Sequence, residues 1–218
     1  MQKLLLPLSL SALLAACGGS ASSPVPHVAQ NSPAVVASAT PAASAAPSTP
    51  SPTAVYVALG DSITALGSPT PYAALLNPNV IDLAISGETA VGAVTDELPQ
   101  VPANATLVTV FLGENDLSHV WESGETVAQY ASAMQAIVAG VKQRAPRAMI
   151  LVLNLPNYPW QQGGMVPYNA VIAALGVTVV DTYDDATYLT ELQTTPVGNI
   201  HPTDAGNREL ASLVQSMI

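Results

Sequence analysis

Apolar residues form five short runs between positions 55 and 180 of the chain. Most of the runs are continuous rather than alternating and are rich in β-branched residues, which is typical of strands buried on both faces of a parallel sheet. They are Val55–Leu59, Val80–Ile85, Leu107–Leu112, Met149–Leu153 and Val177–Val180. The segments between the runs are long enough to hold a helix. The pattern therefore predicts a repeated order of strand and then helix.

Helical spacing is clearest in two segments. The first predicts a long amphipathic helix that ends before Pro146, and the second a C-terminal helix that starts soon after Pro202. Their apolar residues are Val127, Tyr130, Met134, Ile137, Val138 and Val141 in the first, and Leu210, Leu213, Val214 and Met217 in the second. Shorter helices are expected from Thr70-Pro71 to Asn77, with Thr70 as the capping residue, after Gly87, and over Val166–Leu175.

These elements predict an α/β fold, a three-layer α/β/α sandwich with a five-stranded parallel sheet and right-handed crossovers. In such sheets ligands bind outside the carboxyl ends of the strands. The polar residues that directly follow each strand are therefore the candidates for a functional site.

The first residues of the chain follow a different pattern. Lys3, an apolar run over Leu4–Leu14 and small residues before Cys17 are typical of an export signal, and the run is too short to span a bilayer. Leu14-Ala15-Ala16-Cys17 resembles the lipobox of bacterial lipoproteins. The resemblance implies that residues 1–16 are removed and that Cys17 carries a lipid. The alternative is a plain secretory signal with an incidental cysteine.

Residues 17–53 are expected to form a disordered tether. From Gly18 to Thr53 the chain is dominated by Ser, Ala and Pro and contains no charged residue, so that it cannot bury a core. Residues 54–218 then form one domain of ordinary size.

The formal net charge of −10 limits the possible partners. Nucleic-acid binding needs clustered Lys and Arg, which this chain lacks, and anionic lipid headgroups would repel the domain. We therefore expect membrane attachment only through the N-terminal lipid. Gly18 after Cys17 favours the outer membrane of the cell envelope, where organisms follow that sorting rule. The oligomeric state is left open by the sequence.

Four groups of polar residues fall at the predicted ligand-binding edge. They are Gly60-Asp61-Ser62 after the first strand, Ser86-Gly87-Glu88-Thr89 after the second, Gly113-Glu114-Asn115-Asp116 after the third, and Ile200-His201-Pro202 before the last helix. In this order and at these spacings they resemble the SGNH (GDSL-like) hydrolases, whose domain has a flavodoxin-like fold. The resemblance implies that Ser62 is the nucleophile, that His201 is its general base, and that Gly87 and Asn115 belong to the oxyanion hole.

The chemistry of these residue types agrees with the resemblance. A serine hydroxyl is a weak nucleophile at neutral pH and needs a nearby imidazole to take its proton. The backbone N–H groups of Ser62 and Gly87 and the amide of Asn115 can supply the donors that a developing oxyanion requires. We expect neither a metal nor an organic cofactor. Asp61 and Asp116 are expected to form local hydrogen bonds that brace their turns.

One position departs from the family pattern. The family usually has Asp three residues before the histidine, where this chain has Gly198. We expect a Ser–His dyad in which a neutral group accepts the proton on Nδ1 of His201. The candidate acceptors are a backbone carbonyl near Gly198, the side chain of Asn199, and less simply an acid among Asp181, Asp184 and Asp185.

The predicted function is hydrolysis of carboxylic esters, or of thioesters, through an acyl-Ser62 intermediate. Fatty acyl esters and acetylated polysaccharides of cell envelopes or plants are the alternative substrates. A degenerate hydrolase retained as a binding lipoprotein is the alternative from another class, because of Gly198. The aromatic segment Asn154–Tyr168 either lines the substrate pocket or covers the core.

Overall fold

The five expected strands form one sheet in which every neighbouring pair is parallel. A computed structural model describes residues 54–65, 70–117, 125–158, 164–192 and 200–218. Cys17, the expected signal and tether, Gly198 and Asn199 lie outside these residues. The strands are β1 (Tyr56–Gly60), β2 (Ile81–Asp82), β3 (Leu107–Phe111), β4 (Met149–Leu153) and β5 (Thr178–Val180). Their order in the sheet is β2-β1-β3-β4-β5.

The strand order places a topological switch between β1 and β3, two adjacent central strands. The chain leaves β1 toward β2 on one side and returns to β3 on the other. The last residue pair of the two strands is Gly60 and Phe111, so both strands end at the same level. Loops that follow strands at such a switch diverge and leave a crevice for a ligand.

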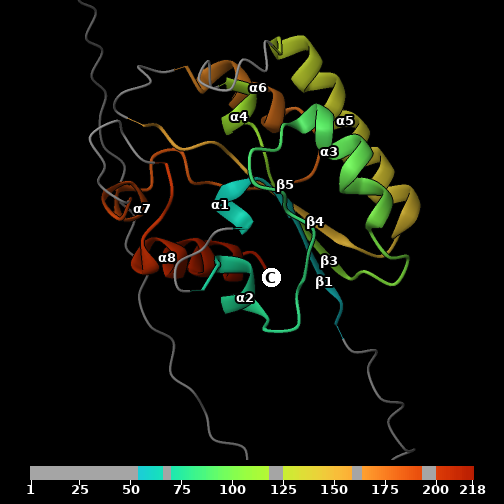
Figure 1. Cartoon of the computed structure of the whole chain (residues 1–218), viewed down its shortest axis with the longest axis horizontal. Helices are drawn as coiled ribbons and strands as arrows, with labels where there is room; N and C mark the ends of the chain where they lie inside the picture. Colours follow the sequence, from blue (N-terminus) through green and yellow to red (C-terminus); the bar gives the residue numbers. More distant parts are fainter. Residues whose placement is uncertain (1–53, 66–69, 118–124, 159–163, 193–199) are drawn as a thin grey trace, which may run out of the picture. The chain divides into compact units, whose positions relative to one another are not determined.

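Helices cover both faces of the sheet, as the three-layer prediction required (Figure 1). On one face α2 and α7 pack against α8, and on the other α3 packs against α5. The helices are α1 (Ser62–Ala65), α2 (Tyr72–Leu76), α3 (Ala90–Asp96), α4 (Glu114–Leu117), α5 (Val127–Arg144), α6 (Val166–Ala173), α7 (Ala186–Thr190) and α8 (Asp204–Gln215), with a 3₁₀ turn η1 (Leu98–Gln100).

Local sequence explains where the long helix α5 begins and ends. Thr126 and Gln129 form a reciprocal capping box at its N-terminus, and Lys142 and Arg144 lie in its last turn, where cations interact favourably with the helix dipole. Its apolar stripe is buried, as the spacing predicted; the buried side chains are Tyr130, Ala133, Met134, Ile137, Val138 and Val141.

Two details of the prediction were wrong. Thr70 does not cap α2, because Pro71 occupies the capping position and no side chain there accepts a helix N–H group. The second strand is a short edge strand and is not buried on both faces, since both its residues are exposed. Leu83 and Ile85 continue the backbone hydrogen bonding to β1 without regular strand pairing.

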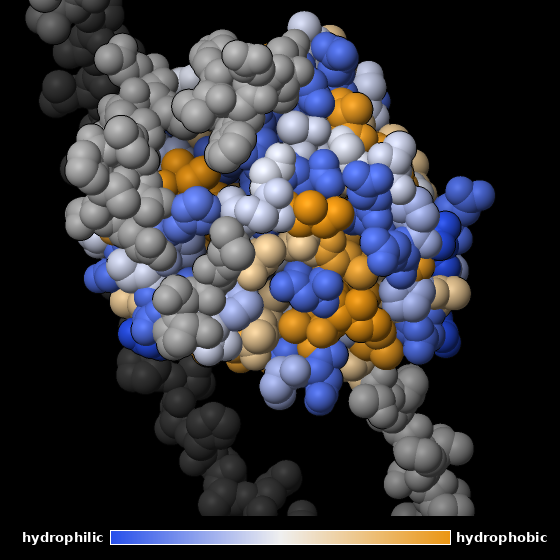
Figure 2. Space-filling model, in the orientation of Figure 1, coloured by the Kyte–Doolittle hydropathy of each residue, from blue (hydrophilic) through white to orange (hydrophobic). Residues whose placement is uncertain are grey.

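Exposure of the β2 edge gives one face of the domain an apolar surface. The Ile81 and Ile85 side chains are among the large apolar side chains that are exposed. In Figure 2 apolar surface (orange) is concentrated between α2 and α3, to the right of and below the centre of the view. None of the described helices is long and apolar enough to cross a bilayer.

Candidate active site

Ser62 and His201 meet at the carboxyl edge of the sheet. Ser62 is the first residue of α1, directly after β1, and His201 lies three residues before α8. The Nε2 atom of His201 lies 2.8 Å from the Oγ atom of Ser62, although 139 residues separate the two in sequence. This is the spacing of a hydrogen bond between a nucleophile and its base. The Ser62 side chain is 6% exposed and His201 is half-buried, so the pair is sheltered and still accessible.

Asn115 joins the loop after β2 to the end of β3. Its Nδ2 atom donates a hydrogen bond of 2.8 Å to the backbone oxygen of Glu88 and lies 3.4 Å from Oδ2 of Asp61. The second distance is long for a hydrogen bond, so a negatively charged oxygen could displace this contact. The structure therefore brings Asn115 beside the loop that carries Gly87.

Gly87 and Ser62 supply backbone donors at the same edge. The φ angle of Gly87 is +84°, a conformation that side-chain-bearing residues rarely adopt. Neither the N–H group of Gly87 nor that of Ser62 donates a hydrogen bond to another described residue. These two N–H groups and the Asn115 amide are the three oxyanion donors that the sequence predicted, and each lies in a loop or helix start after its strand.

Asp61 braces the nucleophile, as expected. Its Oδ1 atom accepts a hydrogen bond of 2.9 Å from the backbone N–H of Ile63, which fixes the start of α1. Asp61 is almost fully buried, and burial raises its pKa to about 7. Its position between Ser62 and Asn115 makes it a structural link between the two.

Asp116 acts over a longer range than the sequence suggested. The backbone nitrogen of Ala90, 26 residues away, lies 3.2 Å from Oδ1 of Asp116 and 3.1 Å from Oδ2. Asp116 therefore holds the first residue of α3. Burial and the neighbouring carboxylate of Glu125 raise the pKa of Asp116 to about 7. Two successive residues of α4, Asn115 and Asp116, therefore bind the segment from Glu88 to Ala90 through hydrogen bonds.

Further buried carboxyl groups surround the ends of β1 and β3. Glu97 and Glu114 are buried, and burial raises the pKa of Glu97 to about 8 and that of Glu114 well above its usual range. Burial also lowers the pKa of His201, which is a base. The imidazole is therefore neutral at neutral pH, the form that can accept a proton.

Two of the three acids that were candidate partners of His201 have other contacts. Asp181 accepts hydrogen bonds from Asn154 and from the backbone of Tyr183, and Asp185 caps α7. Asp184 is exposed. Gly198 and Asn199, the other candidates, lie outside the described residues, so the acceptor of the Nδ1 proton stays a prediction.

The described tyrosines of the aromatic segment cover the core. Tyr158 is fully buried, and Tyr168 is 5% exposed with its ring 4.9 Å from that of Tyr130 on α5. For these two residues the burial supports the core interpretation. Trp160 lies outside the described residues.

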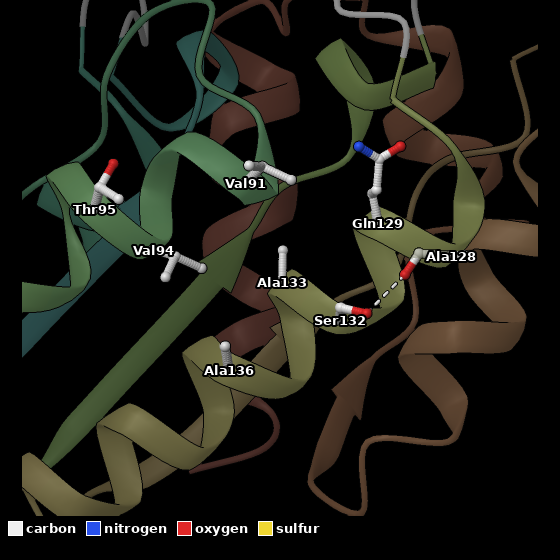
Figure 3. A pocket seen from close by; sticks show the side chains of 8 residues that line it. All are labelled: Val91, Val94, Thr95, Ala128, Gln129, Ser132, Ala133 and Ala136. Atoms are coloured by element: carbon white, nitrogen blue, oxygen red, sulfur yellow. Dashed lines mark hydrogen bonds between the residues drawn. The ribbon is translucent and has the colours of Figure 1, made fainter.

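A separate apolar groove lies between α3 and α5, and neither Ser62 nor His201 lines it (Figure 3). Its volume is about 570 Å³. Val91 and Val94 line it from α3, and small residues such as Ala133 and Ala136 line it from α5. It contains none of the predicted site residues. In the described part of the chain, no group of His, Cys, Asp and Glu is arranged to hold a metal ion.

Comparison with solved structures identifies the same fold in several ester hydrolases. The acetyl xylan esterase AlAXEase shares 21% identity with this chain at a TM-score of 0.61, over 75% of this chain and 100% of that one. An acetyl-xylooligosaccharide esterase from Geobacillus stearothermophilus shares 20% identity at a TM-score of 0.59, and the match covers 75% of this chain and 93% of that one. Phospholipase A1 from Streptomyces albidoflavus shares 18% identity at a TM-score of 0.60, and the match covers 76% of this chain and 99% of that one.

Sequence comparison supplies the family. A search of curated proteins finds no match to this chain. The model of the GDSL-like Lipase/Acylhydrolase family matches residues 58–209, a range that contains Ser62, Gly87, Asn115 and His201. The chain therefore belongs to the GDSL-like lipase/acylhydrolase family and is a serine hydrolase of ester bonds, as its resemblance to the SGNH hydrolases implied.

Proposed function

We propose that this enzyme cleaves carboxylic esters through a covalent acyl-Ser62 intermediate. The observation that carries the proposal is the 2.8 Å distance between Ser62 Oγ and His201 Nε2 at a strand end of the sheet. Labelling by a fluorophosphonate probe tests it, since such probes react with activated serines. Labelling of the wild type and its loss in Ser62→Ala are expected; an unlabelled, folded wild type would favour the alternative of a binding lipoprotein.

Acylation begins with a proton transfer. Nε2 of His201 takes the hydroxyl proton of Ser62 as Oγ forms a bond to the ester carbonyl carbon, whose oxygen becomes negatively charged. The N–H groups of Ser62 and Gly87 and the Asn115 amide stabilise this oxyanion. The carbon–oxygen bond to the leaving group then breaks, and His201 returns its proton to the departing alcohol.

Deacylation repeats the steps with water. His201 takes a proton from a water molecule that attacks the acyl carbon, and the bond to Ser62 Oγ breaks as the proton returns to that oxygen. The carboxylic acid leaves and the enzyme is restored. The lowered pKa of His201 suits both steps, because the base must be neutral at the start of each.

The orientation of His201 is assigned to a neutral acceptor, because Gly198 stands where the family usually has Asp. A backbone carbonyl near Gly198 or the side chain of Asn199 would accept the Nδ1 proton and fix the tautomer in which Nε2 faces Ser62. Such a dyad orients the imidazole but stabilises its charged form less than a carboxylate would.

Two substrate classes are compared in one experiment. Acetyl groups on polysaccharides are a candidate because two proteins with this fold act on acetyl xylan or its oligosaccharides, and longer acyl esters are a candidate because another is a phospholipase A1. A series of nitrophenyl esters from acetate to palmitate, assayed beside acetylated xylan, separates them. A rate that falls steeply beyond acetate, with acetate release from the glycan, supports the first class.

We assign the enzyme to the cell envelope, with export through residues 1–16 and lipid attachment at Cys17. The lipobox-like Leu14-Ala15-Ala16-Cys17 supports this assignment, and Gly18 favours the outer membrane. Residues 17–53 would then space the domain of residues 54–218 from the lipid surface, where polymeric or lipid esters are found.

A further inference from the structure

Two threonines stand at equivalent places behind the two halves of the site. Thr89 lies two residues after Gly87 and caps α3, and Thr203 lies two residues after His201 and caps α8. In each cap the threonine Oγ1 accepts the backbone N–H of the glycine three residues later, at 3.2 Å for Gly92 and at 3.3 Å for Gly206. The segment that carries Gly87 and the segment that carries His201 are therefore each connected to the start of a helix.

Each threonine hydroxyl also donates to a glutamate. Thr89 Oγ1 donates to Oε1 of Glu125 at 3.0 Å, and Thr203 Oγ1 donates to Oε2 of Glu191 at 3.0 Å. A hydroxyl has a single proton, so this bond fixes its rotation and turns a lone pair toward the helix N–H. A charged carboxylate is a stronger acceptor than a neutral oxygen, which favours this orientation of each hydroxyl.

The segment around Glu191 holds the backbone beside His201 as well. The backbone N–H of Thr203 donates to the backbone oxygen of Glu191 at 2.7 Å, and Leu192 and Pro202 form an antiparallel bridge. A Cβ atom at Gly206 would lie 2.8 Å from the same Glu191 oxygen, so only glycine allows this close approach. His201 is thus fixed on its C-terminal side by three contacts with one short segment.

Two carboxyl groups, those of Asp116 and Glu125, hold the segment that follows Gly87. Asp116 binds the N–H of Ala90, and Glu125 binds the side chain of Thr89, the residue before it. Oε2 of Glu125 is buried, and the carboxyl group of Glu125 also lies beside that of Asp116, whose pKa it raises. The backbone two residues before Thr89 is that of Gly87.

We propose that Glu125 and Glu191 are positioning residues of this hydrolase, which set Gly87 and His201 through the hydroxyls of Thr89 and Thr203. The inference rests on the proposed roles of Gly87 and His201. Neither glutamate touches the reacting atoms: Glu191 acts through Thr203, and Glu125 acts through Thr89 and through the neighbouring Asp116. A fixed backbone beside His201 matters more in a chain whose residue 198 is Gly, because the usual carboxylate does not orient the imidazole.

The test compares Ala and Gln variants at both glutamates in the full chain. Glu125→Ala and Glu191→Ala remove the acceptor of the hydroxyl, and we expect kcat to fall about 10- to 100-fold with KM within about twofold, since small displacements of reacting groups cost rate. Glu125→Gln and Glu191→Gln keep an oxygen that can accept the bond, and should restore most of kcat. A melting curve of each variant is used to choose an assay temperature well below its Tm.

Thr106→Val is the matched control. The Thr106 hydroxyl accepts the N–H of Val55 at 2.9 Å directly before β3, at the opposite end of that strand from Asn115. It should lower the melting temperature without lowering kcat. If its kcat falls as far as that of the glutamate variants, their effect is one of general stability and the proposal is wrong.

Combined variants assign each glutamate to its half of the site. Glu125→Ala should cost little more in an Asn115→Ala background, where the oxyanion hole is already impaired, whereas Glu191→Ala should retain its full cost there. Wild-type kcat in both single Ala variants, or Gln variants as slow as Ala variants, would overturn the inference while the esterase function stands. An inactive wild type, or an active Ser62→Ala, would instead overturn the proposed function and this inference with it.

Discussion

The carboxyl group of Glu97 accepts a hydrogen bond of 2.9 Å from the backbone N–H of Gly60, and so joins the end of α3 to the end of β1 two residues before the nucleophile. Glu97 is fully buried, and its other oxygen has no partner among the described residues. A buried carboxyl group in such a place is most stable with its proton.

The first prediction is that the domain becomes less stable as pH rises from 5 to 8. In the fold the pKa is raised to about 7 for Asp61 and Asp116 and to about 8 for Glu97, whereas unfolded chains release these protons near pH 4. The folded state therefore binds more protons across this window, and its stabilisation is lost as pH rises through 7 and 8. We expect Tm to fall by roughly 5–10 °C.

Variants separate this effect from repulsion between surface charges. Glu97→Gln should flatten the dependence of Tm on pH, because it removes one of the titrating groups and keeps its shape. Asp204→Asn, at an exposed position, should leave the slope unchanged. A Tm that stays constant or rises between pH 5 and 8 would contradict the prediction.

The second prediction concerns the nucleophile. Ser62→Ala should abolish ester turnover and fluorophosphonate labelling, because it removes the hydroxyl that lies 2.8 Å from His201 Nε2. The free energy of unfolding should change by about 1 kcal/mol or less, since the change removes one oxygen and leaves no apolar cavity. Residual turnover in a purified, folded variant would exclude Ser62 as nucleophile.

The third prediction concerns the oxyanion hole. Asn115→Ala should lower kcat by about a hundredfold or more with a smaller change in KM, because its amide contributes most when charge develops on the substrate oxygen. The same change removes the bond from Asn115 to the Glu88 oxygen. Asn115→Asp keeps the shape, but as a carboxylate it can donate neither bond, so its kcat should fall at least as far as that of Asn115→Ala. An increase in KM alone would contradict the assignment.

The fourth prediction is the pH dependence of the reaction. The pKa of His201 is lowered by burial, and the base must be neutral, so kcat/KM should fall only when pH drops below the ordinary histidine value of about 6.5. Gly198→Asp should move this acid limb to higher pH and raise kcat several-fold, because a carboxylate favours the charged imidazole. Lower kcat with unchanged Tm would mean that another group already orients His201.

The fifth prediction concerns attachment to the envelope. Cys17→Ser should yield a chain without lipid, because the thioether bond requires sulfur, and this chain should be lost from the membrane fraction after cell disruption. Ester hydrolysis by the released protein should equal that of the wild type, since the folded residues are unchanged. Membrane association that persists in Cys17→Ser would place the anchor elsewhere.

Much of this fold could be predicted because apolar runs and helical spacing report burial directly. The runs at Leu107 and Met149 became β3 and β4, and the spacing from Val127 became α5. The order of Ser62, Gly87, Asn115 and His201 after their elements also indicated one edge of the sheet. A parallel sheet brings the ends of its strands together whatever their distance in sequence.

Other features could not be predicted because they depend on contacts between distant segments. α1 and α4 have four residues each, too few to show a helical period. The exposure of β2 depends on its place at the sheet edge, which an apolar run does not reveal. Nothing near Asp116 in sequence indicates that it binds Ala90, and nothing near Glu97 indicates that it binds Gly60.

The separation of Ser62 and His201 by 139 residues has a consequence for the timing of activity. A ribosome makes the nucleophile early and the base almost last, and His201 reaches Ser62 only when α8 has packed against α2. A nascent or C-terminally shortened chain therefore carries a serine that cannot yet attack an ester. Ester hydrolysis therefore shows that the segments carrying Ser62 and His201 have packed together.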